Sequence, residues 1–275
     1  MTALAIWCNH ETPGHPALWA AADSRITMLK RSPLIEDAVK IMSLPVIARA
    51  PGPGGFTEIY YTHTIGYGFA GSSLMGQNAY LALVPLLSNL ISNTRRIPSL
   101  ADIARYIETF LNRVFEYPKV RGEFACFEVA LFGYCPCRNA LAIYHFEPIG
   151  TPDGAVMRMT AHENLKDRDF IYLGTDRGSM EEAIRTAFAG PNMPGRPTSR
   201  APRYVINDRI SDHSCQAIGG DLQLARADRW GCRPEALAKP RVEGRPEAYL
   251  SYLGYELDED MLRVGEVRVG LNGAV

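Results

Sequence analysis

The first quarter of the chain has a hydrophobic pattern that predicts strands joined by turns. Apolar residues form short runs rich in strand-forming types, and each run is bounded by residues that favour turns. Segment 11–16 contains Pro13, Gly14 and Pro16, so the runs on either side of it are expected to form a hairpin. A loop is expected at 50–55, which is rich in glycine and proline. The strands expected in this part are 2–8, 17–22, 35–48 (with a bend around Lys40) and 58–69.

The middle of the chain changes to helical periodicity. Apolar residues recur every three or four positions in 73–91 and 100–117, and Ser99 is suited to cap the second of these helices. Further along, 190–203 contains four prolines and two glycines, which predicts an exposed loop. The remaining expected elements are strands at 124–134, 140–146, 156–160, 170–173, 222–227 and 262–271, and a helix at 179–188.

The order of these elements and the composition indicate a globular α+β protein. Strands and helices cluster rather than alternate, which favours α+β layering over a regular βαβ fold. The 275 residues suffice for one large domain or two modest ones, and 47% hydrophobic with 21% charged residues is typical of a chain with a sizeable core. The net charge of −1 gives no reason to expect a nucleic acid or an anionic membrane as a partner.

No segment has the composition of a membrane anchor or a leader. The longest apolar stretch, 79–91, is shorter than a bilayer-spanning helix and contains Pro85. The first residues do not form a basic stretch followed by an apolar one. Because the six cysteines occur in a long chain, reduced thiols are the expected state. We therefore expect a cytoplasmic protein, and we expect it to need no metal or cofactor.

Thr2 is the residue with the most specific chemistry. Removal of Met1 would leave a threonine whose hydroxyl lies beside its own free amine, and an α-amine has a pKa of about 7.7–8.0, so it can accept a proton near neutral pH. A hydroxyl activated in this way is a known type of nucleophile. An acid and a lysine would complete the site. Asp23 follows a predicted strand and Lys40 lies at a predicted bend, so both are candidates.

The order of these residues resembles that in the β-type subunits of proteasomes and related bacterial peptidase rings, which belong to the N-terminal nucleophile hydrolase superfamily. In that family a threonine opens the first strand, an acid followed by Ser-Arg ends the second, and a lysine follows about a strand pair later. This chain has Thr2, then Asp23, Ser24 and Arg25, then Lys40. Further matches are 65–72 (IGYGFAGS), 173–175 (LGT) and 218–220 (IGG), so that the resemblance covers about residues 2–228.

The resemblance implies a four-layer αββα sandwich and a threonine peptidase. Residues 1–228 would form the hydrolase domain, and 229–275 would be a C-terminal extension packed on it. The implied partners are a peptide or protein substrate and further copies of the chain in a ring, while an ATPase partner stays open. The resemblance assigns no metal and no cofactor.

The resemblance also implies a role for each candidate site residue. Thr2 would be the nucleophile, Lys40 would stabilise its alkoxide, Asp23 would hold Lys40, and Thr175 would place a hydroxyl near the amine. The Gly71 N–H would face the developing oxyanion. The pocket for an apolar substrate side chain would be lined by Phe69, Ala38 and Met42.

Three positions depart from the family pattern. Asp176 stands where the family has the second glycine of Gly-Ser-Gly, and Ile218 stands where a serine or threonine often precedes Gly-Gly. Cys215 replaces a frequent aspartate, and Asp212 lies one helical turn earlier. Asp212, Cys215 and Arg25 are therefore the candidates for supporting the site. These departures leave two other functions open: a small-molecule amidase on the same fold, and a scaffold subunit without catalytic activity.

Two other motifs have simpler interpretations. Gly66, Gly68 and Gly71 match the spacing of a dinucleotide-binding loop, but no acid follows about 20 residues later and the βαβ order is missing. Cys135 and Cys137 are close enough in sequence for a metal or redox pair, but no second cysteine pair follows at zinc-ribbon spacing. The glycines alone are a weak signal and do not favour a dinucleotide site, and we interpret the two cysteines as thiols in a hairpin turn.

Overall fold

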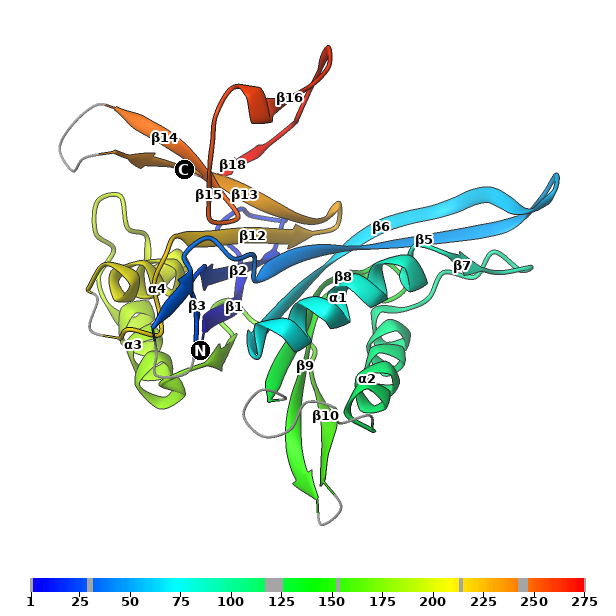
Figure 1. Ribbon diagram of the computed structural model, residues 1–275, viewed down its shortest axis with the longest axis horizontal. Coiled ribbons are helices and arrows are strands. Elements are labelled where there is room, and N and C mark those ends of the chain that lie inside the picture. Colours follow the sequence, from blue (N-terminus) through cyan, green and yellow to red (C-terminus); the bar gives the residue numbers. More distant parts are fainter. Residues whose placement is uncertain are drawn as a thin grey trace.

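The computed structural model describes residues 2–28, 32–116, 126–151, 154–212, 215–241 and 247–274. Two large sheets account for most of the strands (Figure 1). The eight-stranded sheet has the order β11-β1-β2-β12-β13-β14-β15, and β18 pairs with β13. Its strands are β1 (Ala3–Asn9), β2 (Ala17–Asp23), β11 (Phe170–Gly174), β12 (Leu222–Asp228), β13 (Gly231–Pro240), β14 (Ala248–Tyr252), β15 (Tyr255–Leu257) and β18 (Asn272–Ala274).

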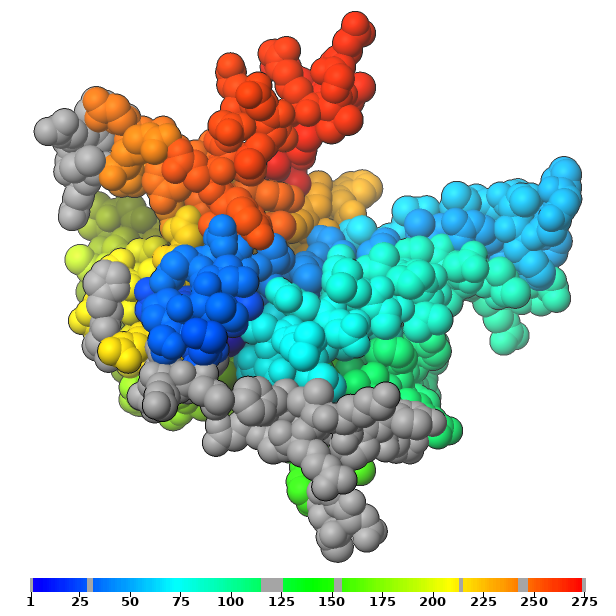
Figure 2. Space-filling model, in the orientation of Figure 1, coloured from blue at the N-terminus to red at the C-terminus, as the bar shows by residue number. Residues whose placement is uncertain are grey.

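The six-stranded sheet contains the longest strands of the described chain. Its order is β10-β9-β8-β6-β5-β7. The hairpin of β5 and β6 projects as an arm from the body of the molecule (Figures 1 and 2). The strands of this sheet are β5 (Ile41–Gly52), β6 (Gly55–Gly71), β7 (Leu90–Ile91), β8 (Phe127–Cys135), β9 (Ala140–Thr151) and β10 (Gly154–His162).

Two small hairpins and the helices complete the described chain. The hairpins are β3 (Ile26–Thr27) with β4 (Pro33–Ile35), and β16 (Arg263–Val264) with β17 (Val267–Arg268). The helices are α1 (Ser73–Leu87), α2 (Leu100–Glu116), α3 (Arg177–Ala189) and α4 (Ala201–Asp212), with short 3₁₀ turns η3 (Thr198–Arg200) and η4 (Asp260–Leu262). Among the described residues, no helix is long and apolar enough to cross a membrane.

The buried apolar residues form three clusters. The first lies between α1, α2 and one face of the six-stranded sheet, and includes Leu83, Ile107 and Tyr67. The second joins the two large sheets, through residues such as Leu4 and Phe132. The third packs α3 and α4 against the other face of the eight-stranded sheet. Burial of these faces supplies the main favourable term for folding.

Helix α2 shows how the local sequence sets an element's start. The Ser99 hydroxyl donates to Asp102 Oδ2 at 2.6 Å and accepts from the Asp102 N–H at 3.1 Å. The Ser99 N–H also donates to Asp102 Oδ2. This reciprocal arrangement satisfies N–H groups that a helix start leaves without partners. The predicted capping role of Ser99 is confirmed.

Several expected elements differ from those observed. The predicted loop at 190–203 contains η3 and the first turn of α4. The expected strand at 262–271 is instead η4 followed by the hairpin of β16 and β17. Segment 50–55, expected as a loop, is mostly strand and lies at the tip of the β5–β6 hairpin, where only a tight turn interrupts the pairing. Strands β13 to β15 are not predicted by the sequence pattern.

The prediction of a four-layer αββα sandwich is wrong. Of the described residues, 47% lie in strands and 25% in helices, and the strands form several sheets and a half-barrel. Helices contact each large sheet, but the strands extend well beyond them in the β5–β6 arm and in the C-terminal strands (Figure 1). Residues 231–240 and 248–257 add strands β13 to β15 to the eight-stranded sheet. The physical cause is pairing: these strands gain their stability from neighbours distant in sequence, which local periodicity does not report.

The glycines at 66 and 68 have a packing role. Both lie within β6, which pairs with β5 and β8 in antiparallel fashion. A Cβ at Gly66 would overlap the Phe132 ring, and one at Gly68 would meet the Leu4 side chain. Both glycines therefore allow close contact across the inter-sheet core, and they lie within a strand rather than in a phosphate-binding loop.

Candidate functional site

Strand register brings Thr2 next to the ends of two other strands. Strand β1 lies between β2 and β11, and the pairings Leu4 with Ala22 and Ala3 with Gly174 fix its position. Because both pairings are antiparallel, the start of β1 lies at the end of β2 and at the end of β11. Thr2 precedes β1, so the end of β2 with Asp23 lies on one side of it and Thr175 lies on the other. Thr2 is buried, with a relative exposure of 1%.

The Asp23 carboxylate is the centre of the site. Its Oδ1 accepts the Ala3 N–H at 2.9 Å and the Lys40 ammonium at 2.8 Å. Its Oδ2 accepts the Gly219 N–H at 3.1 Å. Since Ala3 directly follows Thr2, the first two contacts place the Lys40 ammonium beside the peptide bond that joins Thr2 to β1. The carboxylate thus links the chain's start, the lysine and the 218–220 turn.

Lys40 is a fully buried cation. Its side chain and that of Asp23 both have a relative exposure of 0%. Burial lowers the pKa of Lys40 below the usual lysine value, and the Asp23 carboxylate opposes this effect. A buried ion pair is retained only where its partners compensate the loss of hydration. The Lys40 amine and the Asp23 carboxylate therefore lie in direct contact in a region closed to bulk water.

Gln223 fixes the backbone that carries Lys40, and the sequence analysis missed it. Its Oε1 accepts the N–H groups of Lys40 (3.0 Å) and Ile41 (3.3 Å), and its Nε2 donates to the Ala38 carbonyl at 2.6 Å. Gln223 is buried on β12, in register with Ala22 of β2. The only sequence signal was a polar residue inside an apolar strand, a weak one until the strand's neighbours are known.

Thr175 lies on the other side of Thr2. Its N–H donates to the Thr2 carbonyl at 2.8 Å, and its own carbonyl accepts the Tyr172 hydroxyl at 2.7 Å. The preceding residue, Gly174, has φ +113, and a Cβ there would overlap the Thr2 carbonyl oxygen. The turn after β11 therefore requires glycine, and it holds Thr175 against the start of β1.

Replacing Gly174 by alanine should lower the free energy of unfolding by about 3 kcal/mol, because both the positive φ and the overlap with Thr2 oppose a side chain. Urea denaturation measures the change. Gly178→Ala is the matched control, since a Cβ at Gly178 in α3 meets no atom within 4 Å. That control should change stability by less than about 1 kcal/mol, in the stabilising direction. Equal effects of the two substitutions would contradict the packing described for Thr2.

The two residues after Asp23 connect the surrounding loops. Ser24 Oγ donates to the Glu36 carbonyl and accepts the Asp221 N–H at 2.6 Å. The Arg25 guanidinium donates to Glu36 at 2.8 Å and to the Gln216 carbonyl at 3.0 Å. These bonds hold the segments around Glu36 and Gln216 to the end of β2, which is a supporting position rather than a contact with Thr2.

The other predicted site residues lie in different surroundings. Gly71 ends β6 opposite Phe127 and is exposed. Phe69 is fully buried in the first core cluster, and Met42 packs against the same cluster while half-buried. Ala38 is buried and its carbonyl is held by Gln223. The roles assigned to these residues in binding substrate and the oxyanion stay predictions.

Asp212 and Cys215 lie on either side of two residues outside the described ranges, one of which is His213. Asp212 is exposed at the end of α4. Cys215 is half-buried, packs against the third core cluster and accepts the Ile218 N–H through its carbonyl at 3.1 Å. Its backbone therefore shapes the turn that leads to Gly219. The supporting roles predicted for both residues are untested.

A charged cluster adjoins the site and was not anticipated. Ligand atoms of Glu128, His145 and Glu147 lie within 4.8 Å of one another. The Arg177 guanidinium contacts Glu128 and lies 3.8 Å from Glu147, so a cation from the chain itself lies between these two acids. Glu128 pairs with Ala70 of β6. The cluster therefore joins β8 and β9 to the start of α3, close to the turns that carry Gly71 and Thr175.

Among known proteins, only solved structures show similarity to this chain. No family model matches the chain, and no curated protein matches it. Among solved structures it is similar to Anbu (ancestral beta-subunit) from Yersinia bercovieri, with 14% sequence identity and a TM-score of 0.55. The match covers 90% of this chain and 89% of the other.

This comparison corrects the resemblance drawn from the sequence. The assignment to β-type proteasome subunits or to bacterial proteasome-like peptidases of the N-terminal nucleophile superfamily is wrong, because the sequence matches no such family and the architecture is mostly sheet. At 14% identity, the likeness to Anbu concerns the fold. The chain therefore has a fold similar to that of Anbu.

Proposed function

We propose that this protein is a threonine-type hydrolase of amide bonds, with Thr2 as its nucleophile after removal of Met1. The observation that carries the proposal is the Asp23 oxygen that accepts both the Lys40 ammonium and the N–H next to Thr2. A buried cation, oriented by an acid and placed beside a terminal threonine, is suited to stabilise an alkoxide. The amine of Thr2 would serve as the base.

The proposed reaction proceeds in two steps. The Thr2 hydroxyl gives its proton to the neutral α-amine while its oxygen attacks the substrate carbonyl carbon. The C–N bond then breaks, the leaving amine takes the proton, and an ester remains on Thr2. Water hydrolyses this ester, which releases the carboxylic acid and restores the threonine. Lys40 stabilises the negative oxygen of Thr2 as it forms and as it leaves.

The proposed substrates are peptides or proteins with apolar side chains on the acyl side, cleaved within a homo-oligomeric ring. The apolar preference follows from the pocket predicted at Phe69, Ala38 and Met42. A panel of peptide amides that differ only in that side chain tests it, and native mass spectrometry tests the ring. A monomer active only on small amides would favour the amidase alternative.

Lys40→Met should slow covalent labelling of Thr2 by a threonine-directed epoxyketone about 100-fold or more, since loss of one charge stabilising an oxyanion has an effect of that size. The rate is followed by intact mass. Glu36→Gln, an exposed acid that binds Arg25, is the control and should label at the wild-type rate. Labelling of a folded Lys40→Met at the wild-type rate would refute the role proposed for this lysine.

The pH profile provides a test in the unmodified protein. The labelling rate should rise as the Thr2 amine loses its proton near pH 8, and should fall again where Lys40 becomes neutral. Because burial lowers the pKa of Lys40, the fall should begin below the value of about 10.4 for free lysine. Asp23→Asn removes a charge that raises this pKa, so the fall should move to lower pH. An alkaline limb at the same pH in both proteins would contradict the proposal.

A further inference from the structure

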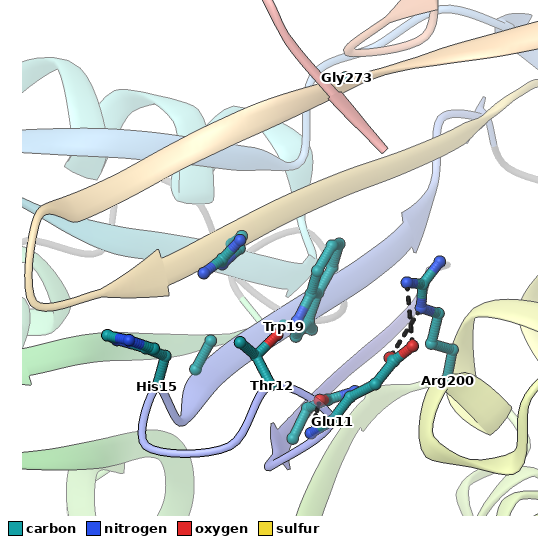
Figure 3. Close-up of a pocket in the computed structure, with 9 residues that line it drawn as sticks. Glu11, Thr12, His15, Trp19, Arg200 and Gly273 are labelled. Atoms are coloured by element: carbon teal, nitrogen blue, oxygen red, sulfur yellow. Dashed lines mark hydrogen bonds and ion pairs between the residues drawn. The ribbon is translucent and has the colours of Figure 1, made fainter. Parts of the chain in front are cut away.

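A cavity lies at the end of β1 opposite Thr2. Its volume is about 280 Å³, and it is lined by residues of the β1–β2 hairpin together with Arg200, Arg226 and Gly273 (Figure 3). Since β1 spans seven residues, the cavity is roughly 20 Å from Thr2 along the strand. The two sites therefore share no residue. The cavity's size suits a small molecule or a single functional group rather than a drug-sized ligand.

The cavity lies beside a cross-strand row of two tryptophans and two arginines, of which Trp19 and Arg226 line it. Trp7 pairs with Trp19, Trp19 with Arg226, and Arg226 with Arg233. Like charges that lie directly opposite each other destabilise a sheet. A single carboxylate, Asp228, contacts both guanidiniums, at 3.1 Å and 3.5 Å.

Two further charged side chains, Arg200 and Glu235, lie near this row. The guanidinium carbons of Arg200 and Arg226 lie 5.9 Å and 6.0 Å from the centre of the Trp19 ring. Glu235 is another acid near the arginine pair; burial raises the pKa of its carboxyl, and the two arginines oppose that shift. An anion bound in the cavity would reduce the repulsion between the arginines.

The acceptors in the cavity wall are already occupied. Glu11 takes two hydrogen bonds from Arg200, at 2.9 Å and 3.1 Å, and one from the Ser199 hydroxyl at 3.2 Å. The Asn9 side-chain oxygen accepts the Glu11 N–H at 2.7 Å. Figure 3 shows Glu11 directed toward Arg200. A ligand that offers only donors would therefore find few partners.

The donors are in surplus. Arg226 Nε is buried and has no hydrogen-bond partner among the described residues. The Thr12 hydroxyl and the His15 ring also make no hydrogen bond within the described chain. A buried donor without a partner costs free energy, which an acceptor in the cavity would recover.

We propose that this cavity is a binding site for a small oxyanion, a phosphate or a carboxylate group, held by Arg226, Thr12 and His15 beside Trp19. The site is independent of the chemistry at Thr2. A guanidinium is the side chain best suited to such groups, because its N–H donors match the geometry of their oxygens.

Tryptophan fluorescence tests this proposal, since the guanidinium groups of Arg200 and Arg226 lie over the Trp19 ring. The full-length protein is titrated with sodium phosphate and, separately, with sodium acetate, each at constant ionic strength maintained with sodium chloride. We expect a saturable change with at least one of the two anions and none in Trp19→Phe. A response to phosphate alone identifies a phosphate site, and a response to acetate alone identifies a carboxylate site.

Variants establish where the anion binds. Arg226→Gln should weaken binding about tenfold or more, and Thr12→Val, at an exposed position, should weaken it several-fold with the fold intact. Arg105→Gln removes an exposed arginine of α2 and should leave the affinity unchanged. Thr2→Ala should also leave it unchanged, which separates this proposal from the one for Thr2. Absence of saturation with either anion, or equal affinities of Arg226→Gln and wild type, would overturn the proposal.

Discussion

Asp23→Ala should lower the free energy of unfolding by about 3–5 kcal/mol, because it leaves the Lys40 ammonium buried without a partner. The substitution also leaves the Ala3 and Gly219 N–H groups without their acceptor. Urea denaturation followed by circular dichroism measures the change. Few single substitutions have effects of this size, so the result would identify Asp23 as the residue that holds this region together.

An exposed ion pair provides the control for this experiment. Glu58→Ala breaks the contact with Arg95, in which both side chains are about half-exposed, and should cost at most about 1 kcal/mol. If Asp23→Ala cost no more than Glu58→Ala, Lys40 would have to be neutral or hydrated in the folded protein. The buried charge on which the proposed chemistry depends would then be absent.

Thr2→Ala should reduce the rate of amide hydrolysis by about 10⁴-fold or more, because it removes the atom that forms the covalent intermediate. The measurement is release of a fluorophore from a peptide amide with an apolar side chain on the acyl side. Thr2→Ser keeps a hydroxyl and should retain activity within about 100-fold, which serves as the positive control.

Stability distinguishes the chemical role of Thr2 from a structural one. Thr2 contributes its backbone carbonyl to the contact with Thr175, and alanine preserves that bond. Thr2→Ala should therefore melt close to the wild-type temperature while it loses activity. If the alanine variant hydrolysed the substrate at the wild-type rate, another residue would be the nucleophile.

The local pattern was sufficient to predict most elements with strong periodicity. The hairpin of β1 and β2, helix α1 and helix α2 appear close to their expected bounds. The order Thr2, Asp23, Lys40 also indicated one cluster, and the structure joins Lys40 to Asp23 and Asp23 to the residue after Thr2. These features depend on short apolar runs and turn residues, which a single sequence reveals.

Other features depend on contacts that a sequence does not reveal. Helix α4 starts in a segment rich in proline. Pro202 occupies its first turn, where proline is favoured, but the prolines of this segment also indicate a loop. Gln223 matters because β12 lies beside β2, and Arg226 matters because it faces Trp19 across the same pair. The layering was predicted incorrectly for the same reason, since pairing between distant strands determines the sheets.

The central claim is that Thr2 acts as an unblocked N-terminal nucleophile, and intact mass spectrometry before and after treatment with the epoxyketone tests it most directly. We predict that the purified protein lacks Met1 and gains one probe molecule, and that fragmentation maps the probe to residue 2. A protein that retains Met1 yet hydrolyses amides, or a probe attached to any other residue, would contradict the claim.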